Sequence, residues 1–311
     1  MTTQLYFVHA LSPLHAGTGQ GSGVIDLPIA REKASGLPYL PGSSVKGVLR
    51  DRAGETDLTY ALFGPKTENA SDHAGALQIA DARLLLLPVR ALRGTFAYVT
   101  SPYILRRFAR DASDAGFTGM PGFPALADGQ CAITEQSKLG GIDLRRGTQA
   151  FNGVVLEDLD LEPHAGSQSL ADQWANWLST RVFPTDDAEW PTLLRERLCM
   201  VSDDVLRFLL TTAIEVIARN RLDDATKTVV KGALWYEEAL PAESVLYGLA
   251  TLTPTKQGLT HYSKQNNNVN FTSKNLLAHL NAQIGRGMQF GGKATVGRGL
   301  CRVRLVGKDG K

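Results

Sequence analysis

An aspartate in the first tenth of the chain is the residue best placed to do chemistry. Asp26 interrupts the apolar hexapeptide at residues 24–29, and His15 and a run of glycines precede it. A carboxylate and an imidazole in one loop could move a proton, and the carboxylate could also bind a divalent cation. The alternative is structural, because a lone loop aspartate often caps a turn or pairs with a cation such as Arg31. The presence of His15 and several cationic side chains in the same loop favours a chemical role for Asp26.

The glycines before Asp26 recur at every second position, at Gly17, Gly19, Gly21 and Gly23. Glycine allows unusual backbone angles and lets a ligand approach the backbone closely. The spacing differs from the G-x-G-x-x-G pattern of dinucleotide-binding folds, so a Rossmann site is excluded. A plain flexible loop is the alternative.

A second glycine-rich stretch lies near the end of the chain. Residues 287–293 match the start of a P-loop, but Ala294 stands where a P-loop needs Ser or Thr, and we expect no long helix after it. An NTPase is therefore not predicted. We interpret the stretch as a basic glycine loop with Lys293 and Arg298, whose backbone N–H groups could cradle phosphates.

Two further segments are candidates for nucleic-acid contacts. Residues 43–50 predict a helix start in which Ser43 or Ser44 caps the helix and Lys46 and Arg50 share one face, a pattern that suits a phosphate. Residues 215–242 predict a hairpin in which cations alternate with β-branched and aromatic residues, as in surfaces that bind nucleic acids. The alternatives are a solvated basic helix face and an edge hairpin with protective charges.

The remaining pattern predicts an α+β fold. We expect strands at residues 4–11, 76–89, 96–99, 151–161, 244–252 and after 299, and helices that begin at 102, 169, 188, 203 and 273. Residues 116–149 show no sustained periodicity and predict a long excursion from the core. A helical insertion is expected at about 115–200. Trp174 and Trp177 have helical spacing and are interpreted as core residues.

Composition sets broad limits. The 311 residues are 43% hydrophobic with a net charge of +2, which neither requires nor excludes a nucleic-acid partner. No run of 18 apolar residues occurs and the N-terminus lacks a secretory pattern, so we expect no membrane contact. The three distant cysteines predict neither a disulfide nor a zinc site, and they fit a reducing cytoplasm.

Several stretches together resemble the RAMP superfamily of CRISPR proteins, and within it the repeated backbone subunit of the type III-B (Cmr) effector complex. They are HAGTGQGSGVIDLPIAREKASGLPYLPGSSVKGVLRD, GALQIADARLLLLPVRALRGTFAYVTSP, VSDDVLRFLLTTAIEVIARNRLDDATKTVVKGALWYEEALP and FGGKATVGRGL. The resemblance implies one domain over 1–311 with an RRM-like (ferredoxin-like) palm. The palm would span about 1–112 and 201–306, with an insertion at about 113–200 and a β-hairpin thumb at about 215–242.

The resemblance also implies a function and residue roles. Copies of the subunit would stack along a CRISPR RNA (crRNA) with other Cmr-type subunits. The thumb would flip out a nucleotide at about every sixth position, and complementary target RNA would be cut at these intervals. Asp26 matches the catalytic aspartate, while His15 and Glu237 match positions near the scissile phosphate. The positions matched to RNA contacts are Gly17, Gly19, Arg31, Ser43, Ser44, Lys46, Arg50, Lys227, Lys231, Gly291, Gly292, Lys293, Gly297 and Arg298.

The chemistry of RNA fits this implied role. The 2′-OH of RNA is its own nucleophile, so the protein needs mainly to hold an in-line geometry. We expect a weakly held Mg²⁺ or Mn²⁺ at Asp26, and products with 2′,3′-cyclic phosphate ends. Whether Asp26 acts as a general base or as a metal ligand stays open. A non-catalytic crRNA-binding filament subunit and a stand-alone guide-processing endoribonuclease are the alternatives.

Overall fold

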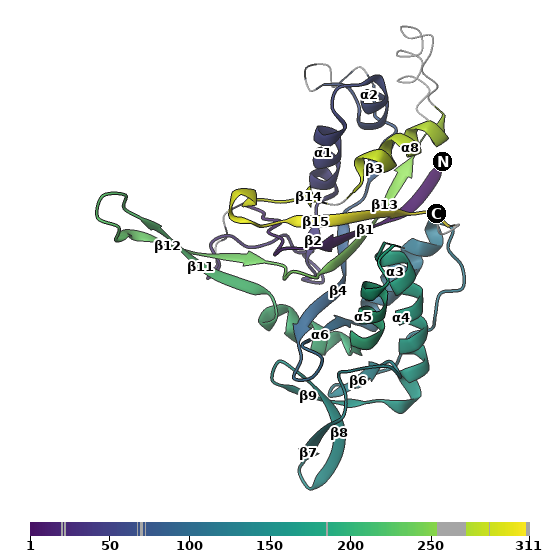
Figure 1. The fold of residues 1–311 in the computed structure, drawn as a ribbon, viewed down its shortest axis with the longest axis vertical. Coiled ribbons are helices and arrows are strands. Elements are labelled where there is room, and N and C mark those ends of the chain that lie inside the picture. The colour runs from purple at the N-terminus through teal and green to yellow at the C-terminus, as the bar shows by residue number, and fades with distance from the viewer. Residues whose placement is uncertain are drawn as a thin grey trace.

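The computed structural model describes residues 1–19, 21, 23–66, 68, 71, 73–184, 186–253, 272–285 and 287–308. Its described strands form one large mixed sheet and a separate two-stranded hairpin (Figure 1). The strands are β1 Thr2–Ala10, β2 Tyr39–Leu40, β3 Leu77–Ile79, β4 Ala82–Arg90, β5 Phe96–Thr100, β6 Gln130–Ile133, β7 Ile142–Arg146, β8 Gln149–Leu156, β9 Leu159–Pro163, β10 Leu198–Val201, β11 Glu215–Leu222, β12 Val229–Ala239, β13 Val245–Leu252, β14 Met288–Gln289 and β15 Leu300–Val306. The helices are α1 Gly42–Ala53, α2 Asp57–Phe63, α3 Pro102–Asp114, α4 Gln168–Val182, α5 Glu189–Arg197, α6 Asp203–Thr212 and α8 Ser273–Gln283. The α+β class is confirmed.

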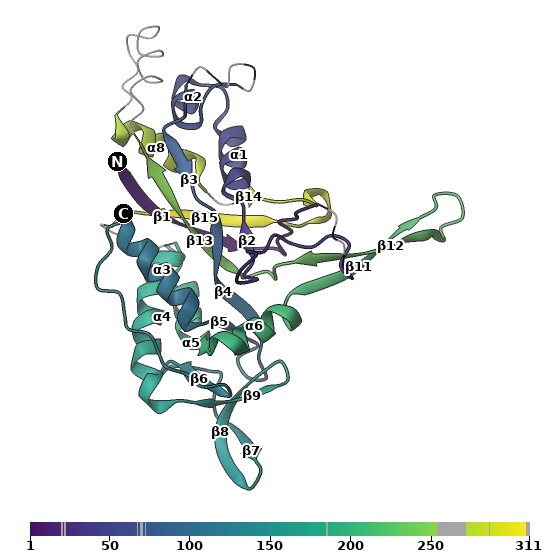
Figure 2. The same ribbon diagram turned by 180° about the vertical axis from the view of Figure 1, so that it is seen from behind.

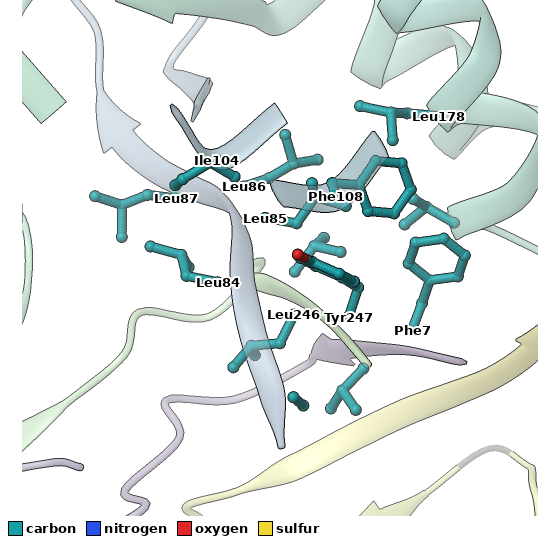
Figure 3. Packing of buried hydrophobic residues seen from close by; sticks show 14 of the residues in the cluster. Phe7, Leu84, Leu85, Leu86, Leu87, Ile104, Phe108, Leu178, Leu246 and Tyr247 are labelled. Carbon is teal, nitrogen blue, oxygen red and sulfur yellow. The ribbon is translucent and has the colours of Figure 1, made fainter. Parts of the chain in front are cut away.

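The centre of the sheet is built from β1, β13 and β4. Strand β13 pairs antiparallel with β1 along its whole length, from Thr2↔Leu252 to His9↔Val245, and with β4 on its other side. Nearly all of β13 is buried, because it is covered on both faces. The leucine run of β4 packs with Phe7 of β1, Tyr247 of β13 and Phe108 of α3 (Figure 3). The predicted strands at 4–11 and 244–252 are therefore confirmed.

The predicted strand at 76–89 is in fact two strands, β3 and β4. Ala80 and Asp81 lie between the two strands. Asp81 turns its carboxylate Oδ1 to the backbone N–H of Gly42, at 2.8 Å, and thereby caps the start of α1. Neither Ser43 nor Ser44 caps this helix, so that prediction was wrong, because the cap comes from a residue distant in sequence.

The segment at 113–200 is less helical than the insertion predicted at about 115–200, and the strand predicted at 151–161 is two strands, β8 and β9. The segment contains α4 and α5, but also the strands β6 to β9, which extend the sheet. Strand β6 is only four residues long and pairs with β10 and β9. Such short strands leave no sustained periodicity in the sequence, which is why residues 116–149 resembled an excursion. Trp174 and Trp177 are core residues, as predicted.

The hairpin of β11 and β12 projects away from the body of the molecule (Figures 1 and 2). Helix α6, whose N-terminus is capped by the Ser202 hydroxyl, leads directly into β11. The strands stay paired from Glu215↔Ala239 outward, with a register shift between Asn220 and Leu222. The predicted hairpin at 215–242 is therefore confirmed. None of the described helices is long and apolar enough to cross a membrane.

Candidate active site

The loop that carries Asp26 lies along the base of the projecting hairpin. Leu27 forms a parallel bridge with Glu237 of β12. The backbone N–H of Leu27 donates to the carbonyl oxygen of Tyr236 at 3.1 Å, and the N–H of Glu238 donates to the carbonyl oxygen of Leu27 at 3.0 Å. This isolated bridge holds the loop against β12.

Asp26 is exposed and oriented. Its Oδ2 accepts a hydrogen bond of 2.8 Å from the backbone N–H of Tyr236, and its carbonyl oxygen accepts one from the N–H of Gly21. Among the described residues, Oδ1 has no hydrogen-bond partner. An exposed carboxylate with one oxygen held and one oxygen open can accept a proton or contact a cation.

His15 lies beneath this loop and is only 7% exposed. Its Nδ1 is 2.6 Å from the carbonyl oxygen of Glu238, which can only accept. Nδ1 therefore carries the hydrogen in the neutral ring, and Nε2 is left as a base. Gly17 makes room for that nitrogen, because a Cβ at residue 17 would lie 2.6 Å from Nε2. Gly19, by contrast, has open space around it.

Glu237 is buried and paired. Its Oε1 accepts from the indole Nε1 of Trp235 at 2.7 Å and lies 2.9 Å from Nζ of Lys293. Burial raises the pKa of the Glu237 carboxyl, but the hydrogen bonds from Trp235 and Lys293 and the positive charge of Lys293 bring the pKa below its ordinary value. Glu237 is therefore a carboxylate that positions Lys293. Its predicted place near the scissile phosphate stays a prediction.

The C-terminal glycine loop meets the N-terminal one at His15. The backbone N–H of Gly292 donates to the carbonyl oxygen of His15 at 3.0 Å. Gly291 has φ 70°, and a Cβ there would lie 2.2 Å from the same oxygen. Lys293 and Gly297 also have positive φ, at 68° and 79°. Only a sharply turned backbone brings Lys293 to Glu237, so this loop depends on its glycines.

Arg298, at the end of the C-terminal glycine loop, also contacts the hairpin. Its guanidinium NH1 donates to Oε2 of Glu215 at 3.2 Å, at the root of β11. Lys293 and Arg298 thus both contact the base of the hairpin. The structure brings the two glycine loops together at His15, and both contact the base of the hairpin.

The residues after Asp26 are anchored on two sides. Arg31 donates to Oε1 of Glu238 at 2.5 Å, while Oε2 of Glu238 accepts from the backbone N–H of Ile29 at 3.0 Å. Glu32 accepts two hydrogen bonds from Arg107 of α3, which hold the pKa of Glu32 below its ordinary value. Arg31 was predicted to contact RNA, but its guanidinium is engaged within the protein.

Other predicted RNA contacts lie on separate elements. On α1, Nζ of Lys46 donates to the carbonyl oxygen of Leu77 at 3.0 Å, and burial lowers the pKa of Lys46. Arg50 donates to the carbonyl oxygen of Pro65 at 2.6 Å. Ser43 is exposed and Ser44 half-buried at the start of this helix.

The two predicted RNA-binding lysines near the tip of the β11–β12 hairpin are exposed to solvent. Lys227 lies in the turn at the tip of the hairpin, and Lys231 lies on β12 near that turn; both side chains are exposed. Figure 1 shows how far the tip lies from the loop of Asp26. These two lysines therefore belong to a different surface.

The residues present could hold a divalent cation only weakly. The described chain contains no cluster of three or more His, Cys, Asp or Glu side chains suited to a metal. Asp26 offers a single carboxylate with one open oxygen. Mg²⁺ often binds through one or two carboxylates and completes its shell with water and substrate phosphates. Asp26 fits that limited role.

Three residues that position the site were not found from the sequence. Tyr236 holds Asp26, Trp235 holds Glu237, and Glu238 contacts the loop through its backbone and its carboxylate. The available signal was the acidic pair at residues 237–238 at the base of a predicted hairpin. Side chains alternate along a strand, so the two acids must face opposite sides.

The sequence profile of the RAMP superfamily matches residues 7–302. The chain belongs to the RAMP superfamily. It is 33% identical to the CRISPR system Cmr endoribonuclease Cmr4 of Pyrococcus furiosus, over 98% of this chain and 96% of that protein.

Two solved structures share the fold. The crystal structure of oligomeric Cmr4 from Pyrococcus furiosus matches with a TM-score of 0.70 and 24% identity, over 98% of both chains. A chain of the type III-B Cmr-beta complex bound to cognate target RNA, solved by cryo-electron microscopy, matches with a TM-score of 0.68 and 19% identity, over 100% of this chain and 99% of that one. The resemblance drawn from the sequence is thereby confirmed.

Proposed function

We propose that this chain is the repeated crRNA-binding backbone subunit of a type III-B effector complex and that it cleaves complementary target RNA. The observation that carries this proposal is the exposed carboxylate of Asp26, held by the N–H of Tyr236 at the base of the projecting hairpin. The 33% identity to a Cmr endoribonuclease supports it. Its partners would be crRNA, target RNA, further copies of itself and other Cmr-type subunits, in the cytoplasm.

The strand order supports an RRM-like palm within this subunit. Strands β15, β1, β13 and β4 are neighbours in that order, with α1 and α2 between β1 and β4 along the chain, and α8 between β13 and β15. This is the β-α-β-β-α-β arrangement of ferredoxin-like folds. The segment at 113–200 would then be an insertion, and the hairpin of β11 and β12 the thumb.

Each site residue would have a separate role in the attack of the 2′-OH on the phosphate. The hairpin would distort the target strand so that a 2′-OH lies in line with its phosphate. Asp26 would accept the proton of that hydroxyl, and the buried His15, whose Nε2 carries no hydrogen in the neutral ring, would be the second candidate base. Lys293, positioned by Glu237, would lie close to the negative charge of the phosphate. A weakly bound Mg²⁺ or Mn²⁺ at Asp26 would add further charge stabilisation.

The crRNA backbone would lie on the glycine loops and on exposed cations. In the C-terminal glycine loop the N–H groups of residues 292 and 296–299 already donate to carbonyl oxygens of the protein, so donors for phosphates would come from the remaining N–H groups of residues 291–295. Lys227 and Lys231 would add charge along the hairpin. The start of α1, with Ser43 and Ser44, would be a further contact. Sequence recognition is left to base pairing between guide and target.

The test is to assemble the complex with the Asp26→Asn variant and supply guide and complementary RNA. We expect regular cleavage products to disappear while target binding is kept, since the substitution preserves shape and removes no cation. Asp158→Asn is the matched control, because Asp158 is an exposed acid in the turn between β8 and β9. Cleavage by Asp26→Asn at the wild-type rate would refute the catalytic assignment.

A non-catalytic filament subunit is the second candidate. The observation that favours it is the Glu237–Lys293 pair, which leaves Asp26 as the one acid of the predicted catalytic set that is exposed. A cleavage assay of the wild-type complex distinguishes the catalytic from the non-catalytic subunit. If no products form with Mg²⁺ or Mn²⁺ and a complementary target, the chain only organises RNA. Cutting of free single-stranded repeat RNA by the chain alone would instead indicate guide processing.

A further inference from the structure

Helix α3 and strand β4 carry a chain of alternating charges that ends at the N-terminal loop of the candidate site. On α3, Arg107 donates two hydrogen bonds to the carboxylate of Glu32, at 2.8 and 2.6 Å. Arg83 of β4 lies between Glu32 and Asp111, because its Nε is 3.8 Å from Oε1 of Glu32 and its NH1 donates to Oδ2 of Asp111 at 2.7 Å. Arg110 donates to the other oxygen of Asp111. We call these five residues the α3 charge network.

The α3 charge network is largely shielded from water. Asp111 is 4% exposed, and the side chains of Arg107 and Glu32 are 15% and 25% exposed. Two parallel hydrogen bonds between an arginine and a carboxylate fix distance and orientation, and shielding from water strengthens them relative to an open surface pair. The hydrogen bonds hold the pKa of Glu32 below its ordinary value and the pKa of Arg107 above its own, so both groups stay charged.

The network stands on the centre of the sheet. Phe108, which follows Arg107 on α3, packs edge-on against Tyr247 of β13, with ring centroids 4.8 Å apart (Figure 3). The hydroxyl of Tyr247 donates to Oδ2 of Asp111 at 3.2 Å. Strand β4, which carries Arg83, pairs with β13. The arginines of the network therefore lie on elements that belong to the central sheet or pack directly on it.

Glu32 connects α3 to the loop of Asp26. The preceding residue, Arg31, donates to the carboxylate of Glu238 at the hairpin base. Asp26 and residues 27–29 bind the same base through further hydrogen bonds. The loop is thus anchored in two directions, to the hairpin and to α3. Because the hairpin itself projects from the body (Figure 1), the contact with α3 sets where the loop lies relative to the sheet.

We propose that Arg107 is a positioning residue for RNA cleavage, which acts by holding Glu32 and thereby the loop of Asp26. The proposal rests on the proposed function, because it assigns a residue to that same reaction. Arg107 acts here through the loop and makes no contact with RNA. A displacement of about 1 Å at a reacting group can cost about 100-fold in rate. Loss of the Arg107–Glu32 contact therefore slows cleavage and leaves RNA affinity unchanged.

Single-turnover cleavage by the assembled complex tests the proposal. Arg107→Ala is expected to lower the rate constant at saturating target RNA by about fivefold or more, with guide and target affinity within about twofold of the wild type. Arg107→Lys keeps the charge without the paired hydrogen bonds, so it should recover part of that rate. A merely structural role would lower the reaction amplitude, which reports the fraction of folded complexes, and would leave the rate constant unchanged.

A matched control and a double variant isolate the contact. Arg106→Ala is the control, because Arg106 is the exposed neighbour of Arg107 on α3 and lies over the ring of Phe123. Its rate constant should stay within about twofold of the wild type. Glu32→Gln removes the other half of the contact, and it is decisive if Arg107→Ala does not fold. The double variant of residues 32 and 107 should be about as slow as the slower single variant.

Amide hydrogen exchange gives a readout that does not depend on cleavage. The N–H of Tyr236 is bonded to the carboxylate of Asp26, so its exchange rate reports whether Asp26 is in place. Arg107→Ala should speed this exchange by about threefold or more, and Arg106→Ala should not.

The outcomes separate the proposal from the proposed function. If the wild-type complex cleaves target RNA but Arg107→Ala changes neither the rate constant nor the exchange at Tyr236, the role of Arg107 is wrong and the proposed function stands. Effects of Arg107→Ala and Glu32→Gln that multiply in the double variant also overturn the proposal, because the two residues then act independently. If the wild-type complex does not cleave, the proposed function fails, and the role of Arg107 in cleavage fails with it.

Discussion

The backbone N–H of Tyr236 donates a hydrogen bond of 2.8 Å to Oδ2 of Asp26. The acid of the candidate site is therefore oriented by the hairpin and not by its own loop. The ring of Tyr236 is exposed, and by the strand register it shares a face of the hairpin with Leu234 and Val216, which are exposed as well. Under the proposed function, a base stacked on this apolar face would lie next to the residue that holds the Asp26 carboxylate.

Glu238→Gln is expected to loosen the loop that carries Asp26. The carboxylate of Glu238 binds Arg31 and the N–H of Ile29, and its backbone binds Leu27 and His15. Loss of one charge from this half-buried pair should cost about 1–3 kcal/mol and lower the melting temperature by a few degrees. The cleavage rate should fall severalfold while guide affinity is unchanged.

Thermal melting and single-turnover cleavage measure these effects. Glu55→Gln is the matched control, because Glu55 forms an exposed ion pair with Lys66 at 2.6 Å. Exposed pairs contribute little to stability, so this control should behave like the wild type. If Glu238→Gln changes the melting temperature and the cleavage rate as little as Glu55→Gln does, Glu238 does not hold the loop of Asp26 in place.

Lys293→Met is expected to change how stability depends on pH. Glu237 has a lowered pKa in the folded protein, so its stabilising contribution is present above its unfolded pKa of about 4.3 and is lost as the pH falls through the folded pKa. Without Lys293, the buried carboxylate, 5% exposed, has lost its charged partner. The variant should therefore be less stable at pH 7, and protonation of Glu237 should relieve part of the loss.

Urea unfolding of both proteins at pH 7 and at about pH 4 tests this. The difference in the free energy of unfolding between wild type and Lys293→Met should shrink at the lower pH. Lys66→Met should show no such difference, because the Lys66–Glu55 pair is exposed. A difference that stays constant over this range would mean that Glu237 does not depend on Lys293.

The parts of the fold that were predictable are those with strong local patterns. The strand β13, the helix after Ser202 and the hairpin of β11 and β12 follow from apolar runs, a capping residue and alternation. Strand β6 and the break between β3 and β4 depend on partners far away in sequence. Asp81 illustrates this, because its carboxylate, which lies between the two strands, accepts a hydrogen bond from Gly42 at the start of α1. No pattern within residues 76–89 records that contact.

In the candidate site, too, local features could be predicted and contacts between distant residues could not. Asp26 and the glycines could be singled out because an acid in an apolar run and regular glycines are visible locally. That Arg31 pairs with Glu238, and Glu237 with Lys293, could not be predicted, because these pairs join residues that lie far apart in the sequence. Sequence reasoning located the charged groups, but it did not show that Arg31 and Lys46 have hydrogen-bond partners within the protein.

Gly291→Ala and Gly292→Ala are expected to have very different effects on stability and cleavage, although the two residues are neighbours. Gly291 has φ 70°, and a Cβ there would collide with the carbonyl oxygen of His15. We expect a loss of about 2 kcal/mol or more in stability and a strong loss of cleavage, because His15 must move. At residue 292 the nearest atom would be Cδ2 of His15 at 3.5 Å, an ordinary contact, so the change should stay within about 0.5 kcal/mol.

Chemical unfolding and cleavage of both variants decide this comparison. Gly23→Ala is a further control in the first glycine loop, since a Cβ at residue 23 meets nothing within 4 Å. It should leave stability nearly unchanged. Equal effects of the two substitutions at residues 291 and 292 would show that His15 does not depend on the shape of this loop.

Lys231→Ala and Lys46→Ala separate RNA contacts from structural cations. Lys231 is exposed, so its loss should lower the slope of guide affinity against salt concentration by about one unit, with no change in melting temperature. Lys46 donates to the carbonyl oxygen of Leu77 and is half-buried. Its loss should lower the melting temperature, because that carbonyl loses its charged donor. Guide affinity is measured by fluorescence anisotropy at four salt concentrations. A full-unit change of slope in Lys46→Ala, with an unchanged melting temperature, would assign Lys46 to the guide and would show that its contact with β3 is dispensable.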